Sequence, residues 1–529
     1  MIPLYLGFLK SEYALMGIRV FFIYPNTFGM NMLPPALALF SALLRQHGHE
    51  IKVFDSTYYQ TDYGVDSDGT KMEFLNVLPY KMDERGIRLR TSDWRTDIQA
   101  QVAEFRPDLI AISATEDMWE LGMHIMAEIE SYKTANKVPV IAGGVFPTFA
   151  PELCLRWPLV DMVCVGEGEN CLVDLCACLE AGRSWDDVTN LWLRKPDGSL
   201  KRNPISRPVD INSVPMIDVG IFEDARLYRP MAGRVYRMLP IETVRGCPYT
   251  CRYCNSPTQT TLYREATDAR FLRKRKMELV HKELLHFKEN LKLEYVYFWA
   301  DTFLALNNRE FDEFCEMYAD IRLPFWMQTR PETITHETIR RLADVGLHRI
   351  SFGIEHGNEA FRSRVLDRRW KNADIIEALQ IPHQYNVQFS VNNITGFPGE
   401  TRALAMDTVE LNRQIPADNA NLYSFTPFHG TPLRKTCEDL GLVRPDTITR
   451  SLTDRPVFEQ PEYPISEIMG LRKCFVLYVA LPKERWPEIR RAEENTPEGN
   501  RLFEVLKQEY MERHLVTPKN NPKANYYTG

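Results

Sequence analysis

The chain has 529 residues, of which 44% are hydrophobic and 26% are charged. This composition is that of an ordinary globular protein, and the length is enough for two or three domains with separate cores. The formal net charge of −7 is small for this length, and it gives no strongly positive surface of the kind that binds nucleic acid.

Neither a leader peptide nor a membrane span is expected from the sequence. Residues 1–16 begin with an apolar stretch but lack a basic start and a small-residue cleavage site. The longest apolar stretch, residues 33–44, contains Pro34, Pro35 and Ser41 and is shorter than the roughly 20 residues that span a bilayer. Eleven cysteines are too dilute, and odd in number, for a disulfide framework. We therefore expect a cytoplasmic protein with reduced thiols.

Residues 1–190 alternate short apolar runs with helical patterns, which predicts an α/β domain. Helices are expected at residues 97–105 and 121–133. Strands are expected at residues 18–24, 51–55, 109–113, 138–144 and 160–166. Strands separated by helices predict a doubly wound, Rossmann-like parallel sheet, and ligands of such sheets bind beyond the carboxyl ends of the strands.

Small and polar residues follow three of these strands. Glycine at a strand end lets the backbone approach a bulky ligand closely, although it more commonly just makes a turn. The candidate ligand-binding residues are Ser113 and Thr115 after the third strand, Gly143, Gly144 and Thr148 after the fourth, and Gly166 and Glu167 after the fifth.

Two further segments complete the first part of the chain. Residues 59–95 form a long insertion, which is expected either to cover a bound cofactor or to add packing. Residues 191–236 read as a connector, with a small hairpin at 191–202 that turns at Asp197-Gly198 and several prolines after it. The connector predicts that two domains dock or hinge across it.

Three cysteines, Cys247, Cys251 and Cys254, lie within eight residues in a C-x₃-C-x₂-C pattern. Thiolates are the usual ligands of iron–sulfur clusters, and a four-iron cluster normally takes four of them. Three ligands therefore leave one iron open to a substrate. The alternative is a structural zinc site, but that requires four ligands, usually as two close pairs, and no second pair is present.

The cysteine pattern, with Tyr253 before its third member, resembles the signature of the radical S-adenosylmethionine (radical SAM) enzymes. Residues 143–152 and 165–169 resemble the N-terminal cobalamin-binding domain of the B12-dependent radical SAM family. The resemblance implies a [4Fe-4S] cluster on the three cysteines, with SAM and cobalamin as further cofactors. It also implies that the reduced cluster cleaves SAM to a 5′-deoxyadenosyl radical. No Asp-x-His-x-x-Gly motif is present, which implies a cobalt without a protein imidazole.

Residues 237–440 repeat the strand-and-helix pattern six times. Strands are expected at 238–244, 295–300, 325–328, 349–354, 387–395 and 421–426. The resemblance implies that these form a partial (β/α)₆ barrel, and active groups of barrel folds collect at the carboxyl ends of the strands.

Polar residues at the predicted strand ends are candidates for binding SAM. Asp301 and Glu355 are expected to accept hydrogen bonds from its ribose or amino group, and Arg330 is the natural partner for its carboxylate. The alternative for each is a structural ion pair inside the barrel. His356 stands where the family commonly has a serine, so its surroundings are expected to contact the substrate.

Three other features have simpler interpretations. The basic run at residues 270–276 is expected to be a solvated helix face. His348 and His429 are expected to be structural. Residues 441–529 read as a mostly helical extension that caps the mouth of the barrel.

The resemblance implies radical methylation, through methylcobalamin, of an unactivated centre in a small molecule or natural product. The expected electron donor is of the flavodoxin or ferredoxin type. One alternative is a non-methylating cobalamin enzyme, such as an anaerobic cyclase of the tetrapyrrole type. Another is a tRNA methylthiotransferase, which would have three more cysteines near its N-terminus, whereas no cysteine precedes Cys154 here. A third is a sensor without turnover.

Overall fold

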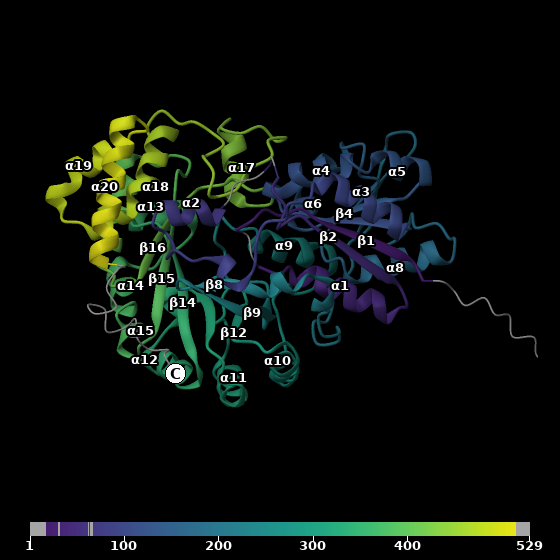
Figure 1. Ribbon diagram of the computed structural model, residues 1–529, viewed down its shortest axis with the longest axis horizontal. Coiled ribbons are helices and arrows are strands. Elements are labelled where there is room, and N and C mark those ends of the chain that lie inside the picture. The colour runs from purple at the N-terminus through teal and green to yellow at the C-terminus, as the bar shows by residue number, and fades with distance from the viewer. Residues whose placement is uncertain (1–16, 30–31, 62, 64–66, 515–529) are drawn as a thin grey trace, which may run out of the picture.

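The computed structural model of the chain describes residues 17–29, 32–61, 63 and 67–514, and it contains two seven-stranded sheets side by side (Figure 1). Residues 1–16, on which the leader prediction depends, lie outside the described residues. In the part of the chain that the structure describes, no helix combines the length and the apolar character that crossing a membrane requires.

The first sheet confirms the predicted doubly wound domain. Its strand order is β2-β1-β3-β4-β5-β6-β7, and the first five strands of this order are parallel. These strands are β1 (Arg19–Tyr24), β2 (Glu50–Asp55), β3 (Leu109–Ser113), β4 (Val140–Gly143) and β5 (Met162–Cys164). Because β2 lies on one side of β1 and β3 on the other, the ligand crevice of such a sheet is expected at the carboxyl ends of β1 and β3.

Helices cover both faces of the first sheet. Alternate residues of β1 point to opposite faces, so that Phe21 packs in one apolar core and Phe22 in the other. The helices are α1 (Pro35–Gln46), α3 (Trp94–Phe105), α4 (Trp119–Ala127), α5 (Glu130–Asn136), α6 (Val145–Phe149), α7 (Pro151–Leu155) and α8 (Glu169–Glu180). The single helix expected at 121–133 is wrong in one respect: the chain breaks at Ile129, which is buried, and α5 begins after it.

The connector contributes strands to both sheets. The hairpin forms as expected, from β6 (Leu191–Arg194) and β7 (Leu200–Arg202), and β6 pairs antiparallel with β5, so the hairpin extends the first sheet. Strand β8 (Tyr228–Met231) pairs antiparallel with β9 and joins the second sheet. The division of the chain at residues 190, 236 and 440 stays a prediction.

The second sheet is the partial (β/α)₆ barrel. Its six parallel strands are β9 (Arg234–Glu242), β12 (Tyr295–Trp299), β13 (Phe325–Thr329), β14 (Leu347–Glu355), β15 (Gln388–Thr395) and β16 (Asn419–Ser424). The helices between and after them are α9 (Ser256–Thr267), α10 (Met277–Leu291), α11 (Asn308–Ile321), α12 (His336–Val345), α13 (Glu359–Leu366), α14 (Asn372–Ala378), α15 (Ile381–Gln384), α16 (Arg402–Asn412) and α17 (Pro432–Asp439).

Aromatic packing fixes the outer layer of the barrel. The rings of Phe298 on β12, Phe314 on α11 and Phe325 on β13 lie with centroids 5.2–5.9 Å apart, in edge-on arrangements that aromatic pairs favour. Helix α11 begins with a capping box, in which the Asn307 side chain accepts a hydrogen bond from the Glu310 backbone N–H at 3.0 Å. Local signals and core packing therefore agree on where this helix lies.

The C-terminal helices α18 (Ile465–Ala480), α19 (Trp486–Ala492) and α20 (Pro497–His514) pack together at the outer end of the barrel, beside β16 (Figure 1). The expectation that they cap the barrel mouth is wrong. Helix α18 buries apolar side chains such as Leu471 and Phe475 in the core cluster of the barrel. The Arg472 guanidinium, 1% exposed, bonds the carbonyl oxygen of Thr453 at 3.0 Å.

The insertion at residues 59–95 crosses to the barrel. It contains α2 (Ser67–Glu73), and the Asn419 side-chain amide on β16 donates a hydrogen bond to the carbonyl oxygen of Asn76. At the other edge of the sheet, a Cβ on Gly233 would lie 3.4 Å from the Leu78 Cβ. Because β8 and β16 are the two edges of the second sheet, the insertion spans the open side of the partial barrel.

Candidate functional site

The loops after β4 and β5 form a cradle at the carboxyl edge of the first sheet. Gly144 has a φ of +116°, and a Cβ there would lie 2.7 Å from the Ala114 carbonyl oxygen. Only glycine fits this turn without strain. The Thr148 hydroxyl donates to the Gly144 carbonyl at 2.8 Å and accepts from the Gly166 N–H at 3.1 Å, so it ties the two loops together.

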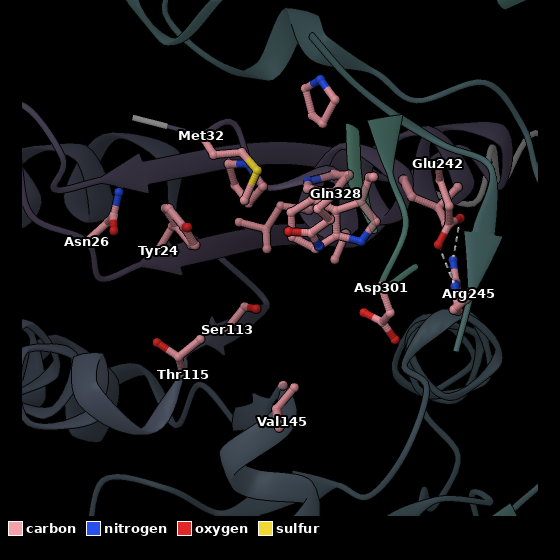
Figure 2. Close-up of a pocket in the computed structure, with 18 of the residues that line it drawn as sticks. Tyr24, Asn26, Met32, Ser113, Thr115, Val145, Glu242, Arg245, Asp301 and Gln328 are labelled. Carbon is pink, nitrogen blue, oxygen red and sulfur yellow. Dashed lines mark hydrogen bonds and ion pairs between the residues drawn. The ribbon is translucent and has the colours of Figure 1, made fainter. Parts of the chain in front are cut away.

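A single cavity of about 900 Å³ joins this edge to the interior of the barrel. Figure 2 shows side chains of both sheets around it, with Ser113 and Thr115 from the first and Asp301 and Gln328 from the second. Of the residues that the sequence predicts as cofactor-binding, those lining this cavity are Ser113, Thr115, Gly143, Gly144, Thr148, Gly166, Glu167 and Asp301. Residues that the sequence predicts as cofactor-binding, although far apart in the chain, therefore line the same cavity.

The cysteine loop begins directly after strand β10 (Val244–Arg245), which pairs with β11 (Arg273–Lys274). Gly246 has a φ of +93°, and a Cβ on it would lie 3.0 Å from the Phe271 ring, so the turn into the cysteines requires glycine. Helix α9 begins two residues after Cys254. The three cysteines are thus held on a short loop between a strand and a helix.

Each cysteine sulfur has at least one polar neighbour. The Cys247 Sγ lies 3.5 Å from the Thr302 hydroxyl, the Ser256 backbone N–H donates to Cys254 Sγ at 3.5 Å, and Arg330 donates to Cys251 Sγ at 3.7 Å. Burial raises the pKa of the Cys254 thiol to about 12 and also raises the pKa of Cys247. Metal binding deprotonates such thiols, because the thiolate is the ligand.

The three cysteines fit the ligand set of a four-iron cluster with one iron left open. In the described part of the chain, no group of three or more His, Cys, Asp or Glu side chains is arranged to hold a single metal ion. A [4Fe-4S] cluster differs, because each thiolate binds a different iron. The loop also places hydrogen-bond donors on the sulfurs, which is the environment that tunes such clusters. Cys247, Cys251 and Cys254 would hold the cluster.

Tyr253, within the cysteine loop, and Glu355, next to it, do not line the cavity. The Tyr253 hydroxyl donates to Glu355 Oε1 at 2.9 Å, and Arg368 donates to the same oxygen at 3.0 Å. Glu355 is 7% exposed and has a φ of +72°, at a bulge between β14 and β15. Burial raises the pKa of Glu355, whereas the Arg368 charge opposes that rise. The carboxylate is thus already bonded within the protein.

Arg330 also has a carboxylate partner, Glu332, with which it forms an ion pair. Its guanidinium lies 3.7 Å from the centre of the Tyr249 ring, inside the cysteine loop. Arg330 therefore contacts both Tyr249 and Cys251 of this loop.

Asp301 is the acidic side chain between the cysteine loop and the cavity. One of its carboxylate oxygens lies 3.5 Å from the Ser256 hydroxyl, two residues after Cys254. Among the described residues it has no ion-pair partner, although its side chain opens into the cavity. The surrounding protein displaces water from around the carboxylate, and this loss of solvation raises the pKa of Asp301.

His356 does not contact this cavity, so the expectation of a substrate contact there is not supported by the geometry. Its side chain is 0% exposed, and Nε2 lies 3.3 Å from Glu400 Oε1. It also packs against the Phe361 ring. His356 is part of the buried layer behind the strand ends.

A network of charges ties the first sheet to the cysteine loop. Arg245, just before Gly246, donates to Glu167 at 2.9 Å and to Glu169 at 2.6 Å, and Arg273 donates to Glu167 at 3.0 Å. The Glu167 backbone N–H donates to the Tyr263 hydroxyl on α9 at 2.6 Å. The loop after β5 is thus fixed directly to the segment that carries the cysteines.

This network corrects the interpretation of the basic run at 270–276. The run is not a solvated helix face, because Arg273 and Lys274 form strand β11 and both are ion-paired, with Glu167 and Glu310. Arg275 is likewise paired with a carboxylate. Arg273 thus helps to dock the two sheets, whereas Lys274 and Arg275 pair within the barrel part of the chain; none of these pairings could be read from the sequence, in which charge runs are usually solvated.

Two family models match the chain where the geometry places the two sites. A Rossmann-like sheet that faces a three-cysteine loop on a partial barrel defines a radical SAM enzyme with a second cofactor domain. The B12 binding domain matches residues 76–176, and the radical SAM superfamily matches residues 241–411. The chain therefore contains a B12 binding domain followed by a radical SAM domain, the combination found in cobalamin-dependent radical SAM enzymes.

Individual relatives agree with this assignment. The chain is 26% identical over 396 residues to an uncharacterized methyltransferase of Pyrococcus horikoshii, PH0819, covering 73% of this chain and 82% of that protein. It is 25% identical over 367 residues to the anaerobic magnesium-protoporphyrin IX monomethyl ester cyclase of Rubrivivax gelatinosus, covering 66% and 62%. The cobalamin-dependent S-adenosylmethionine radical enzyme OxsB shares the fold, with a TM-score of 0.65 at 16% identity over 94% of this chain and 71% of OxsB.

Proposed function

We propose that this enzyme transfers a methyl group to an unactivated centre of a small molecule or natural product. The observation that carries the proposal is the single cavity that runs from the carboxyl edge of the first sheet, past Asp301, into the barrel. A methyl carrier, a radical source and a substrate can share that space without passing through solvent. The similarity to the Pyrococcus horikoshii methyltransferase supports this direction.

The residues present fit both cofactors. When bound, the cluster supplies the electron that cleaves SAM, and cobalamin supplies a carrier for a methyl group. We propose that Ser113, Thr115 and Thr148 contact cobalamin, with Gly143, Gly144 and Gly166 allowing its close approach. Glu167 holds the loop after β5 against Arg245. These small side chains line the cavity at this edge.

The chain's own contribution at the cluster is positioning and electrostatics. Hydrogen bonds to the cysteine sulfurs, such as that from Arg330 to Cys251, stabilise negative charge on the cluster ligands. We propose that Asp301, which opens into the cavity, accepts hydrogen bonds from SAM. We propose that Glu355 and Arg368, outside the cysteine loop, hold its conformation through the hydrogen bond that Tyr253 of the loop donates to Glu355.

Isotope labelling tests the proposed methyl transfer. Protein reconstituted anaerobically with iron, sulfide and cobalamin is given SAM that carries a deuterated methyl group, a reductant and a candidate substrate. A product that is three mass units heavier than the product made with unlabelled SAM supports the proposal. Substrate conversion with 5′-deoxyadenosine formation but without label in the product contradicts it.

A second candidate is a cobalamin radical SAM enzyme that does not transfer a methyl group. The similarity to the Rubrivivax gelatinosus cyclase favours it, although the chain spans only 62% of that protein. The labelling experiment separates the two candidates, because only a methyltransferase moves the deuterated group to the product.

We also propose a cytoplasmic location and an electron donor of the flavodoxin or ferredoxin type. Reducing conditions keep the three cysteines available as cluster ligands. Reduced flavodoxin that supports 5′-deoxyadenosine formation as well as a chemical reductant does would support this donor, and formation only with the chemical reductant would argue against it.

A further inference from the structure

The interior of the barrel has two unlike walls. On one side, Trp299 on β12 and Trp326 on β13 line the cavity. On the other side, strands β14 to β16 present small polar side chains, whose pairing places Ser351 beside Ser390 and Asn392 beside Asn421. This interior suits a ligand with one flat apolar part and several polar groups.

The cationic side chains that line the cavity differ in how they are paired. Among the described residues there are five, and three of them, Lys71, Arg245 and Arg275, are held by carboxylates. Arg229 and Arg349 have no carboxylate within ion-pair distance in the described structure. Arginine in a protein stays charged, and an uncompensated buried charge costs several kcal/mol.

Arg349 lies on β14 and is 8% exposed. Its Nη1 atom donates to Gln388 Oε1 at 3.3 Å, a neutral partner. Asp418 acts on it from a longer distance, but this carboxylate already accepts a hydrogen bond from His383 at 2.8 Å. Burial lowers the pKa of Arg349 more than Asp418 raises it, so the guanidinium is left undercompensated.

Arg229 lies on β8 and reaches across to the aromatic wall. Its guanidinium carbon is 4.8 Å from the centre of the Tyr297 ring and 5.2 Å from that of Trp326. Its Nη1 atom is buried and has no hydrogen-bond partner in the described structure. Trp326 and Arg349 are paired neighbours on β13 and β14, so Trp326 is adjacent to Arg349 in the sheet and in ring contact with Arg229.

Asn421 adds an acceptor to this region. Its side-chain Nδ2 donates to Asn392 Oδ1 at 2.8 Å, whereas its Oδ1 atom is buried without a hydrogen-bond partner. Asn421 is 7% exposed. Buried polar atoms are nearly always paired, so an unpaired acceptor on a cavity wall points to a donor on a ligand.

The insertion separates this region from bulk water at the side of the barrel. It bridges the edge strands through Asn76 and Leu78, and its Lys71, Asp68 and Tyr80 line the same cavity. Interactions between charges are stronger where water is excluded. A negative group on a ligand would therefore gain most in the part of the cavity that Arg229 and Arg349 line.

We propose that the barrel interior is the substrate chamber, and that it binds a small organic acid by its carboxylate or phosphoryl oxyanion between Arg229 and Arg349. The flat or apolar part of the substrate lies against Trp326 and Trp299, and Asn421 accepts a hydrogen bond from a hydroxyl, amine or amide. The reacting centre then faces Asp301 and the edge of the first sheet. This inference rests on the proposed function, for which it names the class of substrate.

Acid and neutral probe pairs test the inference on protein reconstituted with cluster and cobalamin but without SAM. The pairs are indole-3-acetate with indole-3-acetamide, and phenyl phosphate with its dimethyl ester. Hydrogen bonds to charged groups contribute about 1.5–3 kcal/mol, so we expect an acid to bind about tenfold or more tightly than its neutral partner. Arg349→Met and Arg229→Met should remove that difference. A panel in which no acid binds better than its partner overturns the inference.

The stability of the ligand-free protein gives an independent test that needs no probe. Arg349→Met removes an undercompensated buried charge, so the thermal midpoint should rise. Arg472→Met is the matched control, because Arg472 is a buried arginine on α18, outside the cavity lining, whose guanidinium donates to the Ser424 hydroxyl and to the Asp454 backbone carbonyl oxygen, each at 2.7 Å. The thermal midpoint of Arg472→Met should fall, because that change breaks these hydrogen bonds. If the thermal midpoint of Arg349→Met does not rise, Arg349 is not an undercompensated cation in the ligand-free protein, and the inference is contradicted.

Cobalamin carries a phosphate of its own, which is the main competing occupant. Cobalamin titration of Arg349→Met distinguishes the two: a weakened affinity assigns the arginine to the cofactor and overturns the inference, whereas an unchanged affinity with lost acid binding supports it. The inference and the proposed function fail separately, because acid binding is measured without SAM and methyl transfer is measured on the wild-type enzyme.

Discussion

Glu116 is the buried carboxylate through which the first sheet docks onto the loop after β16. It lies just after β3, in a short helix at Glu116–Met118, and is 4% exposed. One oxygen accepts from the His429 backbone N–H at 2.8 Å, and the other accepts from His429 Nδ1 at 2.8 Å and from the Thr449 N–H at 2.9 Å. His429 is therefore structural, as its sequence context predicts.

Replacing Glu116 with Ala should weaken this docking strongly. The change leaves two buried backbone donors and one imidazole without an acceptor, and removing one partner of a buried charged network typically costs about 3–5 kcal/mol. Glu116→Gln should cost less, because the amide oxygen can still accept some of these bonds. Since residues of both sheets line the cavity, weaker docking between them should also weaken cobalamin binding in Glu116→Ala.

Chemical denaturation and limited proteolysis measure the effect. The control is Glu120→Ala, an exposed glutamate on the following helix, which should unfold like the wild type. In Glu116→Ala, the first unfolding transition should move to lower denaturant, and the connector at residues 203–227 should be cleaved faster. Unchanged unfolding and cleavage in Glu116→Ala would refute the reasoning that this carboxylate holds the two parts together.

Three further predictions address the cofactors and the pH response. Gly144→Ala places a Cβ 2.7 Å from a carbonyl oxygen at a φ of +116° and should reduce cobalamin affinity. Gly182→Ala is the control, because Gly182 also has a positive φ (+60°) but lies outside the cavity lining, and it should leave the affinity unchanged; equal effects of the two changes in a cobalamin titration would contradict the cradle. Cys251→Ala should lose most cluster iron in an iron assay, whereas Cys315→Ala should retain it; an unchanged iron content in Cys251→Ala would contradict the ligand assignment. Burial lowers the pKa of His348 from 6.5 to about 4, so the unfolded state takes up the proton first and stability should fall by up to about 3 kcal/mol as the pH drops through that window. His348→Gln should be less sensitive to pH in denaturation, and an equal sensitivity would rule out this histidine as the cause.

The local parts of the site could be predicted from the sequence. Cys247, Cys251 and Cys254 lie within eight residues, so their spacing alone limits the kind of site they form. The strands could also be predicted, because a buried strand requires a continuous apolar run, as in β3. The boundary between α4 and α5 could not, because the break at Ile129 depends on where that side chain is buried in the core.

Ion pairs between residues that are distant in the chain could not be predicted from the sequence. Arg245 and Arg273 lie 78 and 106 residues from Glu167, and nothing in the sequence indicates that they meet. Nor does the sequence indicate the partners of Glu355. Its carboxylate is expected to bind SAM, but in the structure it accepts hydrogen bonds from Tyr253 and Arg368. Whether a charged side chain is a ligand or an ion-pair partner depends on its neighbours in space.

The sequence by itself determined the chemistry of the cluster loop and the two fold types, because both follow from short-range patterns of cysteine, glycine and apolar residues. Only the tertiary structure decided that the insertion closes the side of the barrel, that the C-terminal helices lie outside it, and that Arg229 and Arg349 share one chamber. These arrangements depend on contacts between residues distant in the chain, and the energy of a buried charge is set by the complete set of groups that surround it.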